Sequence, residues 1–274
     1  MKYALVDGIR QEASPELRGD CPGCGSPMIP KCGTKKLHHW AHKGRLECDH
    51  WWESETQWHR DWKNHFPAEW QEVRHIAQDG EVHIADVKTP SGNVLEFQFS
   101  AIRPEERAAR EAFYGPEMVW FVNGRRLSRD LASFRKTLVE KKRNSDLPTW
   151  SLELIDLSAN IQNWVESGCR VYFDFGDAHF NHDKYYDEDA LSVTDRADNG
   201  AIWLLQRTGA WTVTATMVLR SKLIEHYVRG AAIPGLPSHP PLRPQTLPAP
   251  SRSPYMSSNG FPAYWQRRPR RARF

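Results

Sequence analysis

The sequence has no apolar run of the length that a membrane span needs. Nowhere among its 274 residues do eighteen apolar residues follow one another, and a helix that crosses a bilayer takes roughly twenty. The apolar stretch in the first residues is also too short for a secretory signal peptide. We therefore expect a soluble, cytoplasmic protein without a membrane partner.

Two further kinds of sequence feature are absent, a nucleotide-binding loop and an internal repeat. No glycine-rich loop of the kind that cradles nucleotide phosphates occurs, which argues against a nucleotide-hydrolysing motor. No internal repeat occurs either. With 39% hydrophobic residues and 12 tryptophans, the chain still has enough apolar material for one or two domains with a proper core.

Cysteines are few and clustered. There are five, an odd number, and four of them lie between residues 21 and 48, which is typical of metal ligands in a reducing compartment rather than of a disulfide framework. Cys21-x₂-Cys24 followed by His39-x₂-His42 supplies four ligands of the kind that tetrahedral Zn²⁺ selects, and such a closed set predicts a structural zinc. A reduced loop without metal is the alternative. The ligand set also has competitors nearby, namely Cys32, His38, Cys48 and His50.

The last part of the chain lacks acidic residues and lysine. Residues 231–274 contain seven arginines and ten of the 19 prolines, so the net charge of +3 for the whole chain becomes −4 for the preceding 230 residues. This composition predicts a disordered tail. The tail can bind phosphate backbones non-specifically, with Tyr264 and Trp265 available to stack on bases, or it can dock a partner subunit. A tail that is only disordered fits the composition equally well.

Acidic residues suited to metal binding lie on two predicted strands. Residues 81–90 and 94–100 both alternate as strands do, and Glu96 and Gln98 share one strand face. Mg²⁺ is held by one or two carboxylates together with waters and phosphate oxygens. We expect Asp86 and Glu96 to hold Mg²⁺ or Mn²⁺ and Gln98 to orient the attacking water. A surface hairpin with solvated acids is the alternative.

A predicted helix precedes these strands. Its apolar stripe is formed by Trp58, Trp62 and Phe66, which recur at helical spacing. Glu55, His59 and Lys63 are also four residues apart and fall close to this stripe, where charged groups need partners or a metal. This placement favours a site at the junction of helix and sheet over a solvated, salt-bridged helix.

The region after residue 126 is predicted to mix helices and strands. Residues 127–160 have a helical pattern, and residues 177–199 have the composition of a solvated loop. Further predicted elements are strands at 169–175, 201–206 and 211–218 and a final helix at 219–229.

Six segments follow one another in a characteristic order. They are His39-Trp-Ala-His42, Glu55-Thr56-x₂-His59-x₃-Lys63, Ile84-Ala-Asp86-Val87, Glu96-x-Gln98-x-Ser100, Arg110-Glu-Ala-Phe-Tyr114 and Met118-Val-Trp-Phe-Val122. In this order they resemble the CoiA-like competence proteins, which carry a nuclease domain of the PD-(D/E)xK superfamily. The resemblance covers about residues 1–125, and the segments 171–176 and 202–205 resemble strands that often follow.

The resemblance implies an α/β fold of the restriction-endonuclease type, in which helices flank a central mixed sheet. It places Glu55 on the first helix, makes Asp86 and Glu96 the metal ligands, and puts Gln98 where the superfamily has lysine. Glutamine offers no positive charge to the transition state. The metal must then supply most of that charge, or Lys63 must reach in from the helix.

Four parts follow along the chain. We expect a zinc-ribbon-like module at 1–50, a nuclease core at 51–126, an α+β region at 127–230 that packs on the core, and a disordered Pro/Arg-rich tail at 231–274.

The predicted function is metal-dependent hydrolysis of DNA phosphodiester bonds, in competence, recombination or defence against invading phage DNA. Glu55 would complete the metal shell, and His59 and Lys63 would contact the adjacent phosphate. Support of the strand or the nucleic acid is expected from Ser100, Arg107, Arg110 and Tyr114. One alternative is a DNA-binding or scaffold protein whose nuclease fold is inactive. Another is a zinc-dependent interaction module that recruits a partner protein, and a homo-oligomer is also compatible with the sequence.

Overall fold

The computed structural model describes residues 1–44, 48–51, 53–77, 80–139, 148–176 and 200–237. All of them belong to one compact unit, Met1–Pro241. The loop predicted at 177–199 and most of the predicted tail lie outside the described residues. No helix in the described part of the chain combines the length and apolar composition of a bilayer span.

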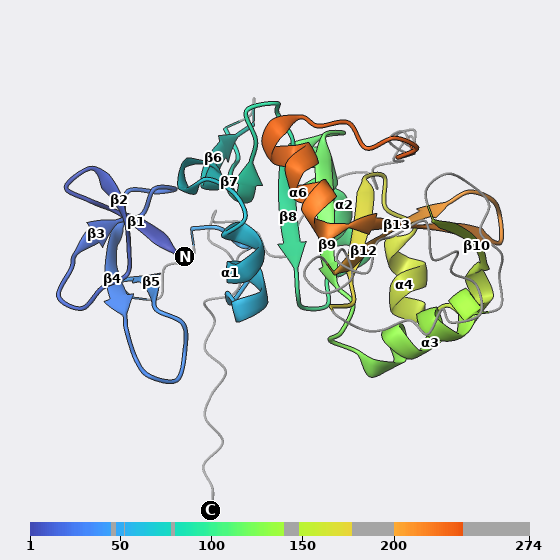
Figure 1. Ribbon diagram of the computed structural model, residues 1–274. Coiled ribbons are helices and arrows are strands. Elements are labelled where there is room, and N and C mark those ends of the chain that lie inside the picture. Colours follow the sequence, from blue (N-terminus) through green and yellow to red (C-terminus); the bar gives the residue numbers. More distant parts are fainter. Residues whose placement is uncertain (45–47, 52, 78–79, 140–147, 177–199, 238–274) are drawn as a thin grey trace, which may run out of the picture. The chain divides into compact units, whose positions relative to one another are not determined.

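Five short antiparallel strands form a small N-terminal sheet (Figure 1) with the order β2-β1-β3-β4-β5. The first hairpin turns through Asp7 and Gly8, whose φ angles of 51° and 79° match the twist that a two-residue hairpin loop requires. The small core of this sheet contains Met28 and Trp40. The strands are β1 Tyr3–Val6, β2 Ile9–Glu12, β3 Gly19–Asp20, β4 Pro27–Lys31 and β5 His39–His42.

An eight-stranded mixed sheet follows, with the order β10-β13-β12-β11-β9-β8-β7-β6. The pairs β8–β9 and β9–β11 are parallel, and the other described pairs are antiparallel. The strands are β6 Gln71–Ile76, β7 Val82–Lys88, β8 Val94–Gln98, β9 Met118–Asn123, β10 Thr149–Glu153, β11 Arg170–Asp174, β12 Ala201–Arg207 and β13 Thr212–Leu219.

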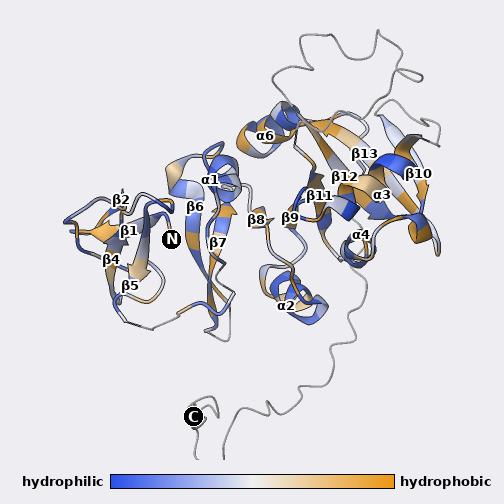
Figure 2. Ribbon diagram, turned by 90° about the horizontal axis from the view of Figure 1, so that it is seen from below, coloured by the Kyte–Doolittle hydropathy of each residue, from blue (hydrophilic) through white to orange (hydrophobic). Residues whose placement is uncertain are grey.

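Helices cover both faces of this sheet. The α-helices are α1 Gln57–Lys63, α2 Pro104–Tyr114, α3 Ser128–Val139, α4 Ala159–Trp164 and α6 Arg220–Arg229, and the two 3₁₀ turns are η1 Ala68–Trp70 and η2 Leu154–Asp156. On one face, apolar residues of α1 and α6 pack against Leu95, Phe97 and Phe121. In Figure 2, β12 is mostly hydrophobic and α2 mostly hydrophilic, as expected for a buried strand and a helix with one solvated side.

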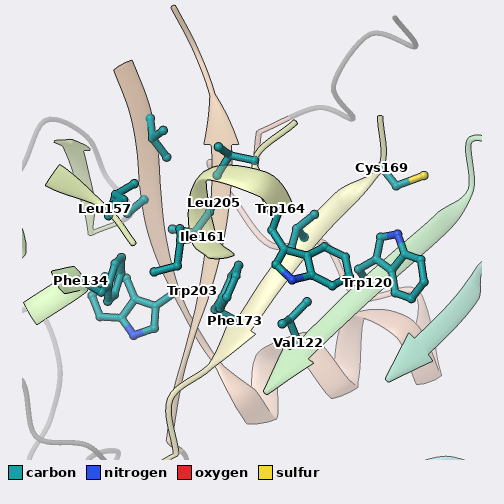
Figure 3. Packing of buried hydrophobic residues seen from close by; sticks show 14 of the residues in the cluster. Trp120, Val122, Phe134, Leu157, Ile161, Trp164, Cys169, Phe173, Trp203 and Leu205 are labelled. Atoms are coloured by element: carbon teal, nitrogen blue, oxygen red, sulfur yellow. The ribbon is translucent and has the colours of Figure 1, made fainter. Parts of the chain in front are cut away.

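The opposite face is filled by α3 and α4. Figure 3 shows Phe134 beside Trp203 and Trp164 beside Trp120, with Phe173 between these pairs. Because β9 and β11 are covered on both faces, all of their residues except Arg170 are buried.

The prediction of a helix over 127–160 is wrong in its second half. α3 ends at Val139, and Thr149–Glu153 form β10, which pairs with β13. Trp150 and Leu152 are buried while their neighbours are not, and this alternation with period two is the signal of a strand. The elements predicted after residue 168 are confirmed as β11, β12, β13 and α6, with bounds that differ by one residue.

The mixed α/β class with helices on both sides of the sheet is also confirmed. Residues on both sides of position 126 contribute strands to the same sheet, because β9 pairs directly with β11.

We expect Phe173→Ala to lower the free energy of unfolding by about 3–5 kcal/mol, since it leaves a cavity in a close-packed core. Phe173 is fully buried, whereas Ile155 is 78% exposed. Ile155→Ala is therefore the matched control, with an expected change of at most about 0.5 kcal/mol. Urea unfolding of the two variants measures both values, and similar losses would contradict this assignment of the core.

Candidate zinc cluster and carboxylate site

Three cysteines and one histidine meet at the edge of the N-terminal sheet. The ligand atoms of the group all lie within 4.8 Å of one another, and its members are Cys21, Cys24, His42 and Cys48. The Sγ atoms of Cys21 and Cys48 are 3.7 Å apart, and Cys24 Sγ is 3.4 Å from His42 Nε2. None of these cysteines forms a disulfide. Three thiolates and an imidazole at this separation are a donor set that could hold a zinc ion, and four protein ligands close its coordination shell.

The turn between the first two cysteines brings them together. The amide of Gly25 donates to the carbonyl of Cys21 at 2.8 Å, and Gly25 adopts a φ of 72°, which glycine tolerates without strain. Burial opposes ionisation of Cys24, but hydrogen bonds with Ser26, His42 and Cys48 outweigh it and lower its pKa to about 6. A thiol with a lowered pKa is prepared for metal binding.

The predicted ligand His39 lies outside this cluster, and Cys48 completes it. His39 and His42 both belong to β5, and residues three apart on a strand point to opposite faces. The ring of His39 is instead 2.8 Å from the carbonyl of Leu37. The strand pattern of residues 39–42 therefore already excludes His39 and His42 as ligands of one metal ion.

The remaining competitors have other surroundings. Cys32 packs against the small core, and the carbonyl of His38 accepts a hydrogen bond from Arg60. His50 forms a second group with Asp49 and His83.

Strands β7 and β8 pair at Lys88 and Val87 and separate from Asp86 onward. This fork contains the two predicted metal ligands, Asp86 and Glu96. The last backbone pair joins Val87 to Leu95. At the next residues, side-chain carboxylates accept the hydrogen bonds in place of backbone carbonyls. The amide of Asp86 donates to Glu96 Oε1 at 3.1 Å, and the amide of Phe97 donates to Asp86 Oδ2 at 3.0 Å. The two carboxylates are thus held next to each other where the strands separate.

Burial makes both carboxyl groups reluctant to ionise. Burial and Asp86 raise the pKa of Glu96 to about 8, although Arg110 opposes the shift. Burial also raises the pKa of Asp86, against the effects of Lys63 and His59. The Asp86 side chain remains 26% exposed, so the pair can be reached from solvent.

Lys63 approaches Asp86 from α1. Its Nζ atom is 2.6 Å from Glu55, 2.9 Å from Glu72 and 3.9 Å from Asp86. Burial disfavours the charged form of Lys63, but the carboxylates of Glu72, Asp86 and Glu55 outweigh this effect and raise its pKa.

Glu55 precedes the helix on which it was predicted. Thr56 is the N-cap of α1 and forms a capping box with His59, so the helix begins at Gln57. Glu55 nevertheless faces the site, where it pairs with Lys63 and, at 2.6 Å, with Arg60.

Gln98 and His59 meet through a residue that the sequence did not reveal, Glu53. Gln98 Nε2 donates to Glu53 at 3.0 Å and to the carbonyl of Ser100 at 3.1 Å. The amide of Ser100 donates to the other oxygen of Glu53 at 2.6 Å. His59 accepts the amide hydrogen of Thr56 at Nδ1, and its Nε2 lies 3.6 Å from Glu53.

The residues predicted on α2 are buried. Arg110 lies 3.6 Å from Glu96, donates to the carbonyl of Trp51 and pairs with Glu106 at 2.6 Å. Tyr114 belongs to the same core cluster as Trp51. Arg110 therefore lies beside the carboxylate pair as a partner of Glu96.

Arg107 has a structural position. It donates to the carbonyl of Asn163 and lies 3.4 Å from Glu111, which links α2 to α4. Because its side chain is only 9% exposed, direct contact with a nucleic acid would require this link to open.

Glu72 is the second residue that the sequence did not reveal. Its φ of 48° is unusual for a residue with a side chain. Its carboxylate accepts the amides of Lys2 at 2.7 Å and Tyr3 at 3.0 Å and pairs with Lys63. Burial opposes ionisation, but Lys63 and these amides help to lower the pKa of Glu72 to about 2. The apolar spacing of a strand carries no signal for such a role.

The first part of the chain matches a known protein family. Residues 10–50 match the family described as Competence protein CoiA, N-terminal domain. This segment contains all four residues of the zinc cluster and ends before the carboxylate site. No curated protein and no solved structure matches the chain.

We expect the purified protein to bind about one zinc ion, and Cys48→Ser to abolish tight binding because it opens the coordination shell. His39→Ala is the matched control and should retain the metal. Zinc content measured by atomic absorption, together with titration of released zinc by a colorimetric chelator, distinguishes the two variants. Loss of zinc from the His39→Ala variant, with retention in Cys48→Ser, would reverse our assignment.

We expect Glu72→Gln to destabilise the protein by about 3 kcal/mol at pH 7, because it removes one carboxylate from a buried ion cluster. The folded-state pKa of Glu72, about 2, is below its unfolded value of about 4.3. Its contribution is therefore complete above about pH 4.3 and is lost as the pH falls towards 2.

The difference in unfolding free energy between wild type and Glu72→Gln should accordingly shrink as the pH falls below about 4.3. Urea unfolding at pH 7, 4 and 3 measures this difference, with the exposed Glu69→Gln as control. A difference that stays constant over this range would show that ionisation of Glu72 is not the cause.

Proposed function

We propose that this chain is a metal-dependent nuclease that hydrolyses DNA phosphodiester bonds, with the fork between β7 and β8 as its active site. The observation that carries the proposal is the reciprocal bonding of Asp86 and Glu96, which holds two carboxylates side by side at the point where the strands separate. Two adjacent carboxylates repel each other unless a proton or a cation lies between them. This donor set fits Mg²⁺ or Mn²⁺, which prefer oxygen ligands.

When bound, such a cation lowers the pKa of a coordinated water and neutralises charge on the scissile phosphate. Asp86 and Glu96 would hold it. Within the described residues, both hydrogen bonds of the Gln98 side chain are made by Nε2. Its Oε1 atom is then the acceptor that can orient a water molecule, and Glu53 keeps the amide in place.

Lys63 supports the proposal because it brings a positive charge to the site. Gln98, which stands on β8 where the superfamily has lysine, carries no charge. The ammonium group of Lys63 is 3.9 Å from Asp86 and is held by Glu55 and Glu72. A fixed cation beside the reacting phosphate stabilises the charge that develops in the transition state. His59 acts on Gln98 through Glu53 and is in this scheme a positioning residue.

The match of residues 10–50 to a competence protein domain supports a role in the handling of DNA during competence. Recombination and defence against phage DNA would use the same chemistry. The restriction-endonuclease type of fold belongs to this proposal, and the mixed sheet with helices on both faces is compatible with it.

One observation favours a second candidate, a DNA-binding or scaffold protein without cleavage. Among the described residues, no third ligand group joins Asp86 and Glu96, since Glu55 is paired with Arg60 and Lys63. In this case the zinc module would serve to recruit DNA or a partner protein.

We expect the protein to cut linear, circular or single-stranded DNA in the presence of Mg²⁺ or Mn²⁺. The double variant Asp86→Asn, Glu96→Gln should reduce the cleavage rate by at least about 100-fold. The exposed residues Glu69 and Glu105 give a control of equal charge change, Glu69→Gln with Glu105→Gln, which should cut as the wild type does.

Circular dichroism and zinc content establish that all three proteins are folded. If the folded wild type cuts none of these substrates with either metal, the nuclease proposal fails and the binding role is favoured. If the Asp86 and Glu96 variant cuts as fast as the control, the active site lies elsewhere.

A further inference from the structure

A cleft opens at the carboxyl ends of the three parallel strands. Its volume is about 460 Å³, within the range of about 300–1,000 Å³ that is usual for sites of small ligands. Phe99 follows β8, Arg125 and Arg126 follow β9, and Asp174 ends β11. In open α/β sheets, ligands bind outside the carboxyl ends of parallel strands. None of the residues assigned to the carboxylate site lines this cleft.

One wall of the cleft is fixed by a buried carboxylate. Asp174 Oδ2 accepts the indole N–H groups of both Trp58 and Trp62, each at 2.8 Å. Asp174 Oδ1 accepts the amide of Gly176 at 2.7 Å and faces Arg220 at 3.4 Å. Asp174 is only 4% exposed, so its charge is matched inside the protein. The tryptophan rings are therefore oriented before a ligand arrives.

The charge of the cleft favours an anion. Arg125 and Arg126 are exposed at its rim, and Arg220 reaches it from the start of α6. Asp61 is the other acidic residue of the lining. Arg220 is paired with Asp174, and Asp61 accepts a hydrogen bond from Gln57 at 2.6 Å. The two exposed guanidinium groups of Arg125 and Arg126 therefore remain for the oxygens of a ligand. The planar donor fork of arginine matches the oxygens of a phosphate group.

Aromatic rings complete the lining. Trp58 and Phe99 are both partly exposed, and their ring centroids are 6.3 Å apart with the planes tilted by 52°. A base can stack on such a ring only when its flat face is free. Single-stranded nucleic acids present these faces, whereas bases in a duplex keep them covered.

The cleft also lies next to the carboxylate site. Phe99 directly follows Gln98, and Trp58 directly precedes His59 on α1. The centroid of the Phe99 ring is 6.0 Å from that of His59. A strand that reaches the carboxylate pair can therefore place a neighbouring nucleotide in the cleft.

We propose that this cleft binds one unpaired nucleotide of single-stranded DNA, with its phosphate on Arg125 and Arg126 and its base against Trp58 and Phe99. The assignment as part of a cleavage site rests on the proposed function, but binding itself does not need cleavage. The substrate class that follows is DNA with at least one unpaired nucleotide beside the cut.

The test uses the full-length, zinc-loaded protein in EGTA-free buffer without added Mg²⁺ or Mn²⁺, so that binding is measured without cutting. The probe is a 12-nucleotide DNA carrying 2-aminopurine, either alone or annealed to its complement. Anisotropy of an end label measures affinity, and quenching of 2-aminopurine reports stacking. We expect tighter binding and stronger quenching for the single strand than for the duplex.

Two variants separate the two contacts. Phe99→Ala should weaken binding of the single strand roughly 5- to 100-fold and reduce quenching, because it removes a stacking surface. Arg126→Ala should weaken binding and lower the slope of log affinity against log salt by about 0.7, as expected for the loss of one phosphate contact. Phe99→Ala should leave this slope unchanged.

Arg129→Ala is the matched control. Arg129 is exposed and close in sequence to Arg126 but does not line the cleft. The arginines of residues 238–274 remain in every variant, so their non-specific binding is common to all measurements. Circular dichroism and thermal unfolding confirm that each variant is folded.

Equal affinity for single strand and duplex, or variants of Phe99 and Arg126 that behave as Arg129→Ala does, would overturn the proposal. Cleavage of DNA by the wild type and by the cleft variants separates the cleft proposal from the nuclease assignment. If the wild type does not cut DNA but 2-aminopurine in the single strand is still quenched on binding, the nuclease assignment fails and the cleft assignment stands. If the wild type cuts DNA and the variants of the cleft bind and cut as it does, the reverse holds.

Discussion

The buried ammonium group of Lys63 is the charge that joins the parts of this protein around the carboxylate site. It pairs with Glu55 before α1 and with Glu72 on β6, and it lies 3.9 Å from Asp86 on β7. A charge in this position would be costly without partners, and each carboxylate would be costly without it. Glu72 also accepts the amide of Tyr3 in β1 and that of Lys2 just before it. One ion cluster thus ties the N-terminal sheet, the first helix and the large sheet together.

The geometry of the large sheet decides where chemistry can occur. β7 and β8 separate at Asp86, and carboxylates take over the hydrogen bonds that backbone carbonyls would otherwise accept. Further along, β8, β9 and β11 run parallel and end on the same side, which brings residues from three distant segments to one cleft. The fork and the cleft are adjacent because Gln98 ends β8 and Phe99 begins the following loop.

The zinc cluster is connected to the same strand. Cys48 completes the cluster, and the next residue, Asp49, accepts the amide of Ile84 at 3.0 Å and lies 2.8 Å from the ring of His83. Trp51 stacks on that ring with a centroid distance of 3.3 Å. The segment that leaves the metal site is thus fastened to β7, two residues before Asp86. A zinc ion held by this cluster would therefore also steady the strand that carries Asp86.

The sequence by itself determined the elements whose signals are local. The cysteine spacing, the two alternating strands around Asp86 and Glu96, the apolar stripe of α1 and the late strands all follow from periods of two or 3.6 residues and from turn chemistry. Only the tertiary structure decided which side chains meet. It brought Cys48 to within 3.7 Å of Cys21 as the fourth member of the cluster, and it made Thr149–Glu153 a strand because β13 offers an edge to pair with. It also brought Glu53, Glu72 and Asp174 into their roles, because a buried charge is placed by partners that lie far away in the chain, and no local pattern records that distance.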